Sequence, residues 1–315
     1  MRGEPRDGIW LTVDIDAVRV DFDPGQIVVL NAILAFIMFG VSLDLRPPDF
    51  LDLARSPRAP LVGLVAQFVL LPAMTFALTT VLPLPDSLKL GMIMVAACPG
   101  GTVSNFMTHL AGGRLATSVG MTAVSSTAAL VTVPLNLAFW GGLQSGTAQL
   151  VDAVQLDAAD VMRTVLVVLV VPVAAGMLVG TQFPRLAQGA RTPVRILSLL
   201  FLCVLVVAAT RKNLGLLLQI AHLIIYPVVL MNALAFLLGW SSARAFDLDA
   251  KDQRAVTLEV GIQNSGLGLA LALQFFNSVG GVAAICAFWG IWHLLGGLAL
   301  ASFWSRWPVP SEGTA

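Results

Sequence analysis

The chain has 315 residues, of which 57% are hydrophobic and only 11% are charged. Soluble domains carry about one quarter charged residues, so this composition predicts a polytopic membrane protein whose main partner is the lipid bilayer. The net charge is zero and the basic residues are scattered, which argues against a nucleic-acid partner. The three cysteines lie far apart and offer neither a disulfide framework nor a metal-binding spacing.

The first stretch, residues 1–26, holds six acidic residues and no apolar segment. A signal peptide needs an apolar central segment, so we expect a solvated acidic N-terminal tail here instead. Residues 27–304 are expected to form one transmembrane domain, and residues 305–315 a short C-terminal tail. The links between the apolar runs are too short to contain a second soluble domain.

Apolar runs of about twenty residues are long enough to cross the hydrocarbon core of a bilayer. The sequence contains nine such runs, so the fold class that we expect is all-α, with about nine transmembrane helices. Proline inside a span is expected to kink it, which applies to Pro72, Pro134, Pro172 and Pro227. The expected spans are residues 27–45, 60–82, 88–111, 115–141, 163–181, 194–211, 219–242, 254–276 and 282–304.

The orientation follows from the basic residues in the links, because lysine and arginine concentrate on the cytoplasmic side. Eleven of the eighteen fall on the side of the C-terminus, and seven fall on the other side, three of these in the N-terminal tail. We therefore expect a multi-pass protein of the cell membrane with its N-terminus outside and its C-terminus in the cytoplasm. The eleven are Arg46, Arg55, Arg58, Arg114, Arg185, Arg191, Arg195, Arg244, Lys251, Arg254 and Arg306.

The third span contains Pro99-Gly100-Gly101 in the middle of an apolar run. This tripeptide predicts a broken helix, whose freed backbone groups need protein or a water-lined cavity around them. The oxygen-bearing residues Thr102, Ser104 and Asn105 follow directly. Free N–H groups at the start of the second half-helix favour an anion.

The eighth span contains Glu259, the only glutamate outside the two polar tails. A charged side chain at the bilayer centre costs about 2.5–3.5 kcal/mol even on lenient scales, so it should face protein and have a partner. Gln263 lies one turn further on the same face, and Gly261 and Gly266 let the backbone leave helical geometry. The apolar run 255–276 holds no lysine or arginine, so a bound cation is the natural counter-charge. The alternative is a protonated glutamate hydrogen-bonded between helices.

Two broken, polar-dotted helices about 160 residues apart predict an inverted-repeat transporter with its site at the membrane midplane. Other polar residues within spans fit this interpretation. Gln67 lies inside the second span, and Ser118 and Thr122 lie four residues apart on one face of the fourth. Each of these hydroxyls could bind a ligand or the carbonyl of its own helix. His293, in the last span, could donate into a cavity or be an interior histidine.

At these residues the chain resembles the bile acid:sodium symporter family of secondary transporters. The resemblance runs through residues 38–43, 66–72, 98–105, 259–266 and 292–293 and covers nearly the whole chain beyond residue 27. Its most specific parts are CPGGTVSN at 98–105 and EVGIQNSG at 259–266. The family's fold implies a core bundle, in which the broken helices cross, and a panel bundle beside it. It also implies two sodium sites and no organic cofactor, so sodium and a small organic anion are the expected ligands.

The implied ligands are carried over residue by residue. Hard cations take oxygen ligands, and these positions supply hydroxyls, amides, carbonyls and one carboxylate. The first sodium site resembles Ser104, Asn105, Ser118, Thr122 and Glu259. The second resembles Gln67, Glu259, Gln263 and the backbone carbonyls of Val260 and Ile262. The residues expected to face the substrate between the bundles are Thr102, Asn264 and His293.

The chain departs from some members of the family. Ten-span members have an extra first helix, whereas residues 1–26 are polar here, so the chain resembles the nine-span form with unequal repeats of four and five spans. Leu294 follows His293 where some members carry a polar side chain, which bears on the substrate more than on the ion sites.

Several other functions compete with sodium-coupled transport as interpretations of the sequence. Proton coupling through Glu259, or transport without sodium, is the nearest alternative. Arsenite exporters of the wider superfamily use a cysteine in the broken helix, as Cys98 would suggest, but Glu259 with Gln263 favours sodium. A ligand-sensing membrane protein would need an output domain. An enzyme is not expected, because no nucleophile and base share a local signature. None of the three lysines lies in a phosphate-binding G-x-x-x-x-G-K loop.

Overall fold

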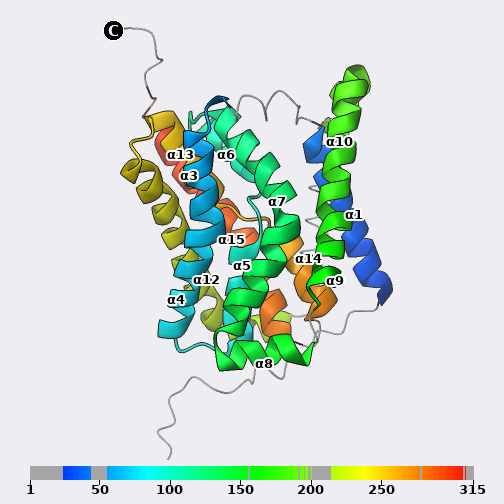
Figure 1. The fold of residues 1–315 in the computed structure, drawn as a ribbon, viewed down its shortest axis with the longest axis vertical. Helices are drawn as coiled ribbons and strands as arrows, with labels where there is room; N and C mark the ends of the chain where they lie inside the picture. The colour runs from blue at the N-terminus through cyan, green and yellow to red at the C-terminus, as the bar shows by residue number, and fades with distance from the viewer. Residues whose placement is uncertain are drawn as a thin grey trace, which may run out of the picture.

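The computed structural model describes residues 24–43, 55–154, 157–190, 214–276 and 279–307, together with residues 192–194, 196, 197, 200 and 309. Every regular element in these ranges is a helix, and Figure 1 shows the long helices running along one common direction. The one extended pairing among them is an isolated antiparallel bridge between Gly100 and Gln263. The predicted all-α fold class is confirmed.

Five described helical stretches are long and apolar enough to cross a bilayer, which supports the predicted polytopic membrane protein. α1 (Pro24–Ser42) covers most of the predicted first span. The predicted span 194–211 lies mostly outside the described residues, so the total of nine stays a prediction. The five stretches are Arg58–Val81, Leu115–Gly142, Ala158–Gln182, Ala221–Ala245 and Gly280–Ser305.

Two of these stretches widen into a π-helical turn just before a proline. α3 (Arg58–Val65) continues through η2 (Ala66–Leu70) into α4 (Leu71–Val81), which contains Pro72. α9 (Ala158–Val165) continues through η3 (Leu166–Val170) into α10 (Val171–Gln182), which contains Pro172. Proline lacks an N–H and its ring clashes with the carbonyl four residues back, and a π-turn is a common local adjustment. The other two prolines lie inside α7 (Leu115–Gly142) and α12 (Leu214–Ala245), which continue past them.

The third and eighth predicted spans are each divided into two half-helices, as the glycines predicted. The first pair is α5 (Asp86–Ala97) and α6 (Val103–Leu110), and the second is α13 (Ala250–Gly261) and α14 (Ser265–Phe275). The two breaks meet in the middle of the molecule. There the Gly101 N–H donates to the Ile262 carbonyl at 2.8 Å, and the Asn264 N–H donates to the Pro99 carbonyl at 2.8 Å. Each break therefore satisfies backbone groups that the other leaves free.

The half-helix α5 lies at the centre of the fold, and α15 (Gly280–Ser305) packs along it. Ten of the twelve α5 residues are buried. Gly91 permits a close approach, because a Cβ there would lie 2.8 Å from the Ile285 Cβ of α15. Small residues of this kind let membrane helices pack closely.

Two groups of described helices stand side by side in Figure 1. α1, α9, η3 and α10 form one group, in which α1 packs along α10 and η3. The remaining helices form the other. The two groups meet where α9 and η3 pack on α7, and where α1 and α9 pack on α14. The short helix α8 (Ser145–Ala153) joins α7 to α9 at one end of the molecule.

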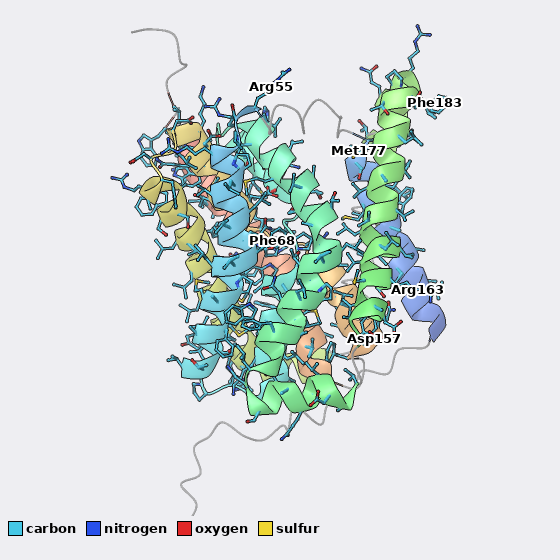
Figure 2. The ribbon with its side chains drawn as sticks, viewed as in Figure 1. Arg55, Phe68, Asp157, Arg163, Met177 and Phe183 are labelled. Carbon is cyan, nitrogen blue, oxygen red and sulfur yellow. The ribbon has the colours of Figure 1, made fainter. Side chains whose placement is uncertain are left out.

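The two ends of the helices differ in their charged residues. In Figure 2, Arg55 and Phe183 lie at one end of the helices, whereas Asp157 lies toward the opposite end. Helix connections place the α6–α7 and α12–α13 turns, with Arg114 and Lys251, at the same end as Arg55. These basic residues therefore share one end of the helices, and which end faces the cytoplasm stays a prediction.

Candidate functional site

Glu259 lies in the last turn of α13 and is completely buried. Its carboxylate accepts hydrogen bonds from Ser104, from the Ser118 hydroxyl at 3.0 Å and from the Thr122 hydroxyl at 2.7 Å. Among the described residues, no lysine, arginine or histidine forms a salt bridge with it. An ionised carboxylate in this place has hydrogen-bond donors but no counter-charge.

Asn105 completes this cluster. Its side-chain oxygen lies 2.8 Å from the Ser118 hydroxyl and 3.2 Å from the Thr122 hydroxyl. α6 contributes Ser104 and Asn105 from its first turn, and α7 contributes Ser118 and Thr122 from one face. We call this set the α6–α7–α13 cluster; it contains all five residues predicted for the first sodium site, namely Ser104, Asn105, Ser118, Thr122 and Glu259.

Thr108 belongs beside this cluster, although sequence reasoning did not select it. Its hydroxyl donates to the Ser118 hydroxyl at 3.3 Å, and the residue is completely buried. Thr108 follows Ser104 by one helical turn and so shares its face, and this spacing was the available signal. The Thr122 hydroxyl also lies 3.0 Å from the Ser118 carbonyl of its own helix, so a back-bonding contact is present, and the role of this residue as an ion ligand stays a prediction.

A second pair of polar side chains lies on the other side of the crossing. The Gln67 amide, in η2, donates to the Gln263 side-chain oxygen at 3.3 Å, and the Gln263 amide donates to the Val260 carbonyl at 2.7 Å. The remaining Gln67 oxygen is buried and has no hydrogen-bond partner among the described residues. A Cβ on Gly100 would lie 2.3 Å from Glu259 Oε1 and 3.1 Å from Gln67 Nε2, so the glycine lets Gln67 and Glu259 approach the same point.

Backbone carbonyls predicted as ligands already take part in hydrogen bonds. The Val260 carbonyl accepts from Gln263, and the Ile262 carbonyl accepts from Gly101. A carbonyl oxygen has two lone pairs, so one remains for a cation in each case. The unpartnered Gln67 oxygen, the buried carboxylate and these lone pairs together fit a hard cation such as Na⁺.

The three residues predicted to face the substrate lie on different elements. Thr102 precedes α6 directly, and Asn264 caps α14, since its side-chain oxygen accepts the Leu267 N–H at 3.0 Å. The Asn264 amide also contacts Met38 Sδ of α1 at 3.6 Å. His293 lies on α15, is 4% exposed, and its Nδ1 has no hydrogen-bond partner among the described residues. Thr102 and Asn264 therefore flank the crossing, whereas His293 shares no recorded hydrogen bond with either of them.

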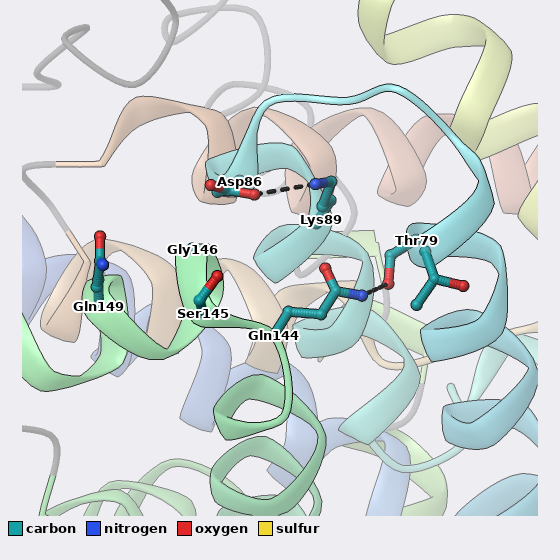
Figure 3. A pocket seen from close by; sticks show the side chains of 8 residues that line it. Thr79, Asp86, Lys89, Gln144, Ser145, Gly146 and Gln149 are labelled. Atoms are coloured by element: carbon teal, nitrogen blue, oxygen red, sulfur yellow. Dashed lines mark hydrogen bonds and ion pairs between the residues drawn. The ribbon is translucent and has the colours of Figure 1, made fainter.

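A polar hollow of about 630 Å³ lies away from this site, at the α8 end of the molecule (Figure 3). An ion pair of 3.0 Å joins Lys89 to Asp86 there, and the Gln144 amide donates to the Thr79 hydroxyl at 2.8 Å. None of the predicted site residues lines this hollow. The predicted ion ligands are instead enclosed by protein, because Gln67, Ser104, Ser118 and Glu259 are all completely buried.

Two interrupted helices cross in this helical membrane protein, beside a buried carboxylate and a set of hydroxyls. This architecture is typical of a secondary transporter. The chain belongs to the sodium bile acid symporter family, whose model matches residues 31–220.

The relatives by sequence include proteins that are named as transporters. The chain is 34% identical over 277 residues to the "Uncharacterized sodium-dependent transporter YocS" of Bacillus subtilis, covering 88% of this chain and 83% of that protein. It is 30% identical to the "Probable sodium/metabolite cotransporter BASS1, chloroplastic" of Arabidopsis thaliana, covering 87% of this chain and 66% of that one. It is 31% identical to the "Probable sodium/metabolite cotransporter BASS6, chloroplastic" of the same plant, covering 87% of this chain and 67% of that protein.

Proposed function

We propose that the protein is a sodium-coupled symporter that takes up a small organic anion across the cell membrane by alternating access. The observation that carries this proposal is the completely buried Glu259, which has hydroxyl donors on both oxygens and no basic partner among the described residues. An unpaired buried carboxylate destabilises a protein by several kcal/mol, and a sodium ion would remove this penalty. The names of the relatives from Bacillus and Arabidopsis support sodium as the ion.

The α6–α7–α13 cluster is proposed to hold one sodium ion. A hydroxyl has one hydrogen and two lone pairs, so Ser104, Ser118 and Thr122 are able to donate to Glu259 and accept the cation at the same time. A second ion would lie on the Gln67 side, between Gln67, Gln263 and the carbonyls of Val260 and Ile262, and share Glu259. The unpartnered Gln67 oxygen supports this second site.

The organic anion is proposed to lie at the crossing, near Thr102, Asn264 and His293. The N-terminal ends of α6 and α14 both lie at the breaks, and free N–H groups there favour a carboxylate or a sulfonate. Two sodium ions on one glutamate leave a net positive charge close by, which favours the same class of ligand. Motion of the α1–α9–η3–α10 group against the other helices would then expose this place to each side in turn.

The test is uptake by purified protein in liposomes. We expect uptake of a radiolabelled bile acid, or of another carboxylate or sulfonate in a panel, to depend on an inward sodium gradient and to stop when choline replaces sodium. A proton gradient imposed without sodium tests the proton-coupled alternative, which predicts uptake under this condition. Equal uptake in sodium and choline across the panel would contradict the proposal.

A further inference from the structure

A second polar cluster joins the first turns of α7 and α13, and we call it the α7–α13 clasp (Arg114, Thr117, Asp249 and Asp252). The Thr117 hydroxyl donates to Asp252 Oδ1 at 2.6 Å, and Arg114 Nε donates to the same oxygen at 3.0 Å. Arg114 Nη2 donates to Asp249 at 2.6 Å. Asp249 in turn caps α13, accepting the N–H groups of Lys251 and Asp252 at 2.9 Å each.

One half of the clasp, the Thr117–Asp252 contact, is enclosed, whereas the Arg114–Asp249 ion pair is exposed, with 35% and 42% of the two side chains accessible. The side chain of Asp252 is 14% exposed, and Thr117 is 5% exposed. Partial burial raises the pKa of the Asp252 carboxyl above its ordinary value, and the hydrogen bond from Thr117 opposes that rise. Exposed ion pairs contribute little to stability because water screens them, so this degree of burial makes the Thr117–Asp252 contact the more effective restraint.

The position of the clasp relates it to the α6–α7–α13 cluster. Thr117 immediately precedes Ser118, so fixing the direction of one side chain on α7 fixes that of the next. Asp252 and Glu259 lie seven residues apart on α13, which is about two helical turns or 10 Å of rise. α7 therefore contacts α13 at two levels, first at the clasp and then where Ser118 and Thr122 reach Glu259 at 3.0 and 2.7 Å.

We propose that Thr117 and Asp252 are positioning residues of the first ion site. They set the rotation and height of α7 against α13, and through these the placement of Ser118 and Thr122 around the ion. The inference rests on the proposed sodium coupling. It bears directly on the first site, because the Gln67–Gln263 pair contains no residue of α7; the second site is linked to α7 only through the shared Glu259.

The first experiment measures sodium dependence of uptake for Thr117→Val and Asp252→Asn in liposomes. Valine keeps the shape of threonine without the donor, and asparagine keeps an acceptor without the charge. We expect the sodium concentration for half-maximal uptake to rise by about threefold to tenfold, more than for loss of a surface ion pair. The KM for the anion at saturating sodium should stay unchanged. Thr117→Ser should restore the wild-type value.

The second experiment is a double-mutant cycle with Ser118→Ala, because residues that act through one another are not additive. If Thr117 acts by placing Ser118, Thr117→Val should have little further effect once Ser118→Ala is present. One matched control is Thr127→Val on the same helix, whose hydroxyl donates to the Ala123 carbonyl at 3.0 Å. The other is Asp247→Asn in the link before α13. Asp247 is exposed with φ 47°, a conformation that asparagine tolerates well.

The outcomes separate this inference from the proposed function. If wild-type uptake ignores sodium, the proposed function fails and the inference fails with it. If wild-type uptake needs sodium, but both clasp variants keep the wild-type half-maximal sodium concentration, the inference alone is overturned. The same holds if Thr117→Val and Ser118→Ala have fully additive effects, or if the variants lower only the amount of protein in the membrane.

Discussion

At the scale of single residues, the site is defined by one buried charge and by the oxygens around it. Glu259 receives hydroxyls from α6 and α7, while Gln67 and Gln263 approach from the other side of Gly100. A carboxylate so placed is neutralised either by a proton or by a cation. Neutralisation by a cation predicts that the apo protein binds added sodium, whereas neutralisation by a proton does not.

Glu259→Gln keeps the size and the hydrogen-bonding capacity of the side chain but removes its charge. We expect sodium-driven uptake to be lost while the protein still folds and inserts, because the amide has no charge to attract a cation. Coupling between two ligands is reciprocal, so the affinity for the anion should rise with sodium in the wild type and not in the variant. Substrate affinity at zero and saturating sodium checks this. A variant that keeps the wild-type response would make Glu259 a structural residue.

Gln67→Leu tests sodium binding at the second site by thermal stability, without a transport measurement. The Gln67 side-chain oxygen is buried and has no hydrogen-bond partner in the part of the chain that the structure describes. Such a group destabilises a protein by about 1–3 kcal/mol. Sodium at the second site would satisfy it, so the wild type should show a sodium-dependent rise in Tm. Leucine has a similar volume and no oxygen, but it also removes the amide that donates to Gln263, so the Tm without sodium can fall. The diagnostic quantity is the rise in Tm on adding sodium, which should be smaller in the variant. An equal rise in both proteins would place the second ion elsewhere.

Residue types and local spacing predicted which side chains were candidate ligands. They did not predict which of these side chains contact one another in the fold. The spacing of Ser118 and Thr122 puts them on one face of a helix, yet their partner Glu259 lies more than 130 residues away in the chain. The family resemblance supplied that grouping, and the structure brings all five residues together. Thr108 was missed because a lone threonine in an apolar helix ordinarily bonds to its own backbone, whereas this one bonds to Ser118.

At the scale of elements, both broken helices were predictable, because Pro-Gly-Gly and spaced glycines interrupt apolar runs. The residues at which these helices begin were less predictable. α13 begins at Ala250 rather than at residue 254, because Asp249 caps it. The π-turns before Pro72 and Pro172 were expected only as kinks. The helix α8 was read as a link, because its nine residues are too short and too polar to span a membrane.

Gly100→Ala tests the crossing of the two breaks. A Cβ there would lie 2.3 Å from Glu259 Oε1, and the backbone on both sides is held by hydrogen bonds to the other break. Overpacking of this kind destabilises by about 1–3 kcal/mol, so we expect sodium-dependent uptake to fall about tenfold or more. The control is Gly142→Ala at the end of α7, where nothing lies within 4 Å of the added Cβ. Normal uptake by Gly100→Ala would show that the crossing rearranges freely.

At the scale of the whole molecule, the proposed orientation makes the α8 end extracellular. Asp157→Cys should therefore react with an impermeant maleimide added to intact cells, and Asp247→Cys should react only after the cells are opened. The two residues lie at opposite ends of the described helices, before α9 and after α12. Labelling in the reverse order would invert the orientation inferred from the basic residues. The native cysteines Cys98 and Cys286 are buried, and the parent protein without an added cysteine gives the labelling background.

The two helix groups are tied together at the α8 end by a short chain of polar side chains. The Asn31 amide of α1 donates to Gln274 of α14 at 3.3 Å, and the Gln274 amide donates to Thr164 of α9 at 2.9 Å. The proposed alternating access would separate α1 and α9 from α14 when the site opens to the outside. Hydrogen bonds between side chains contribute little individually in a membrane, about 0.6 kcal/mol on average, so this contact is weak enough to break in each cycle.

A covalent link across this contact should stop the cycle. We expect the double variant Asn31→Cys/Gln274→Cys to transport before cross-linking and to lose uptake when a short bis-methanethiosulfonate reagent joins the two helices through disulfide bonds. Uptake should recover when a reductant cleaves these disulfides. The control pair is Thr79→Cys/Gln144→Cys at the same end, where the native side chains lie 2.8 Å apart within the larger group of helices (Figure 3). Cross-linking that pair should leave uptake intact, because its two segments move together. Continued uptake by the fully cross-linked Asn31–Gln274 variant would mean that α1 and α14 stay together throughout transport, and that the moving boundary lies elsewhere in the fold.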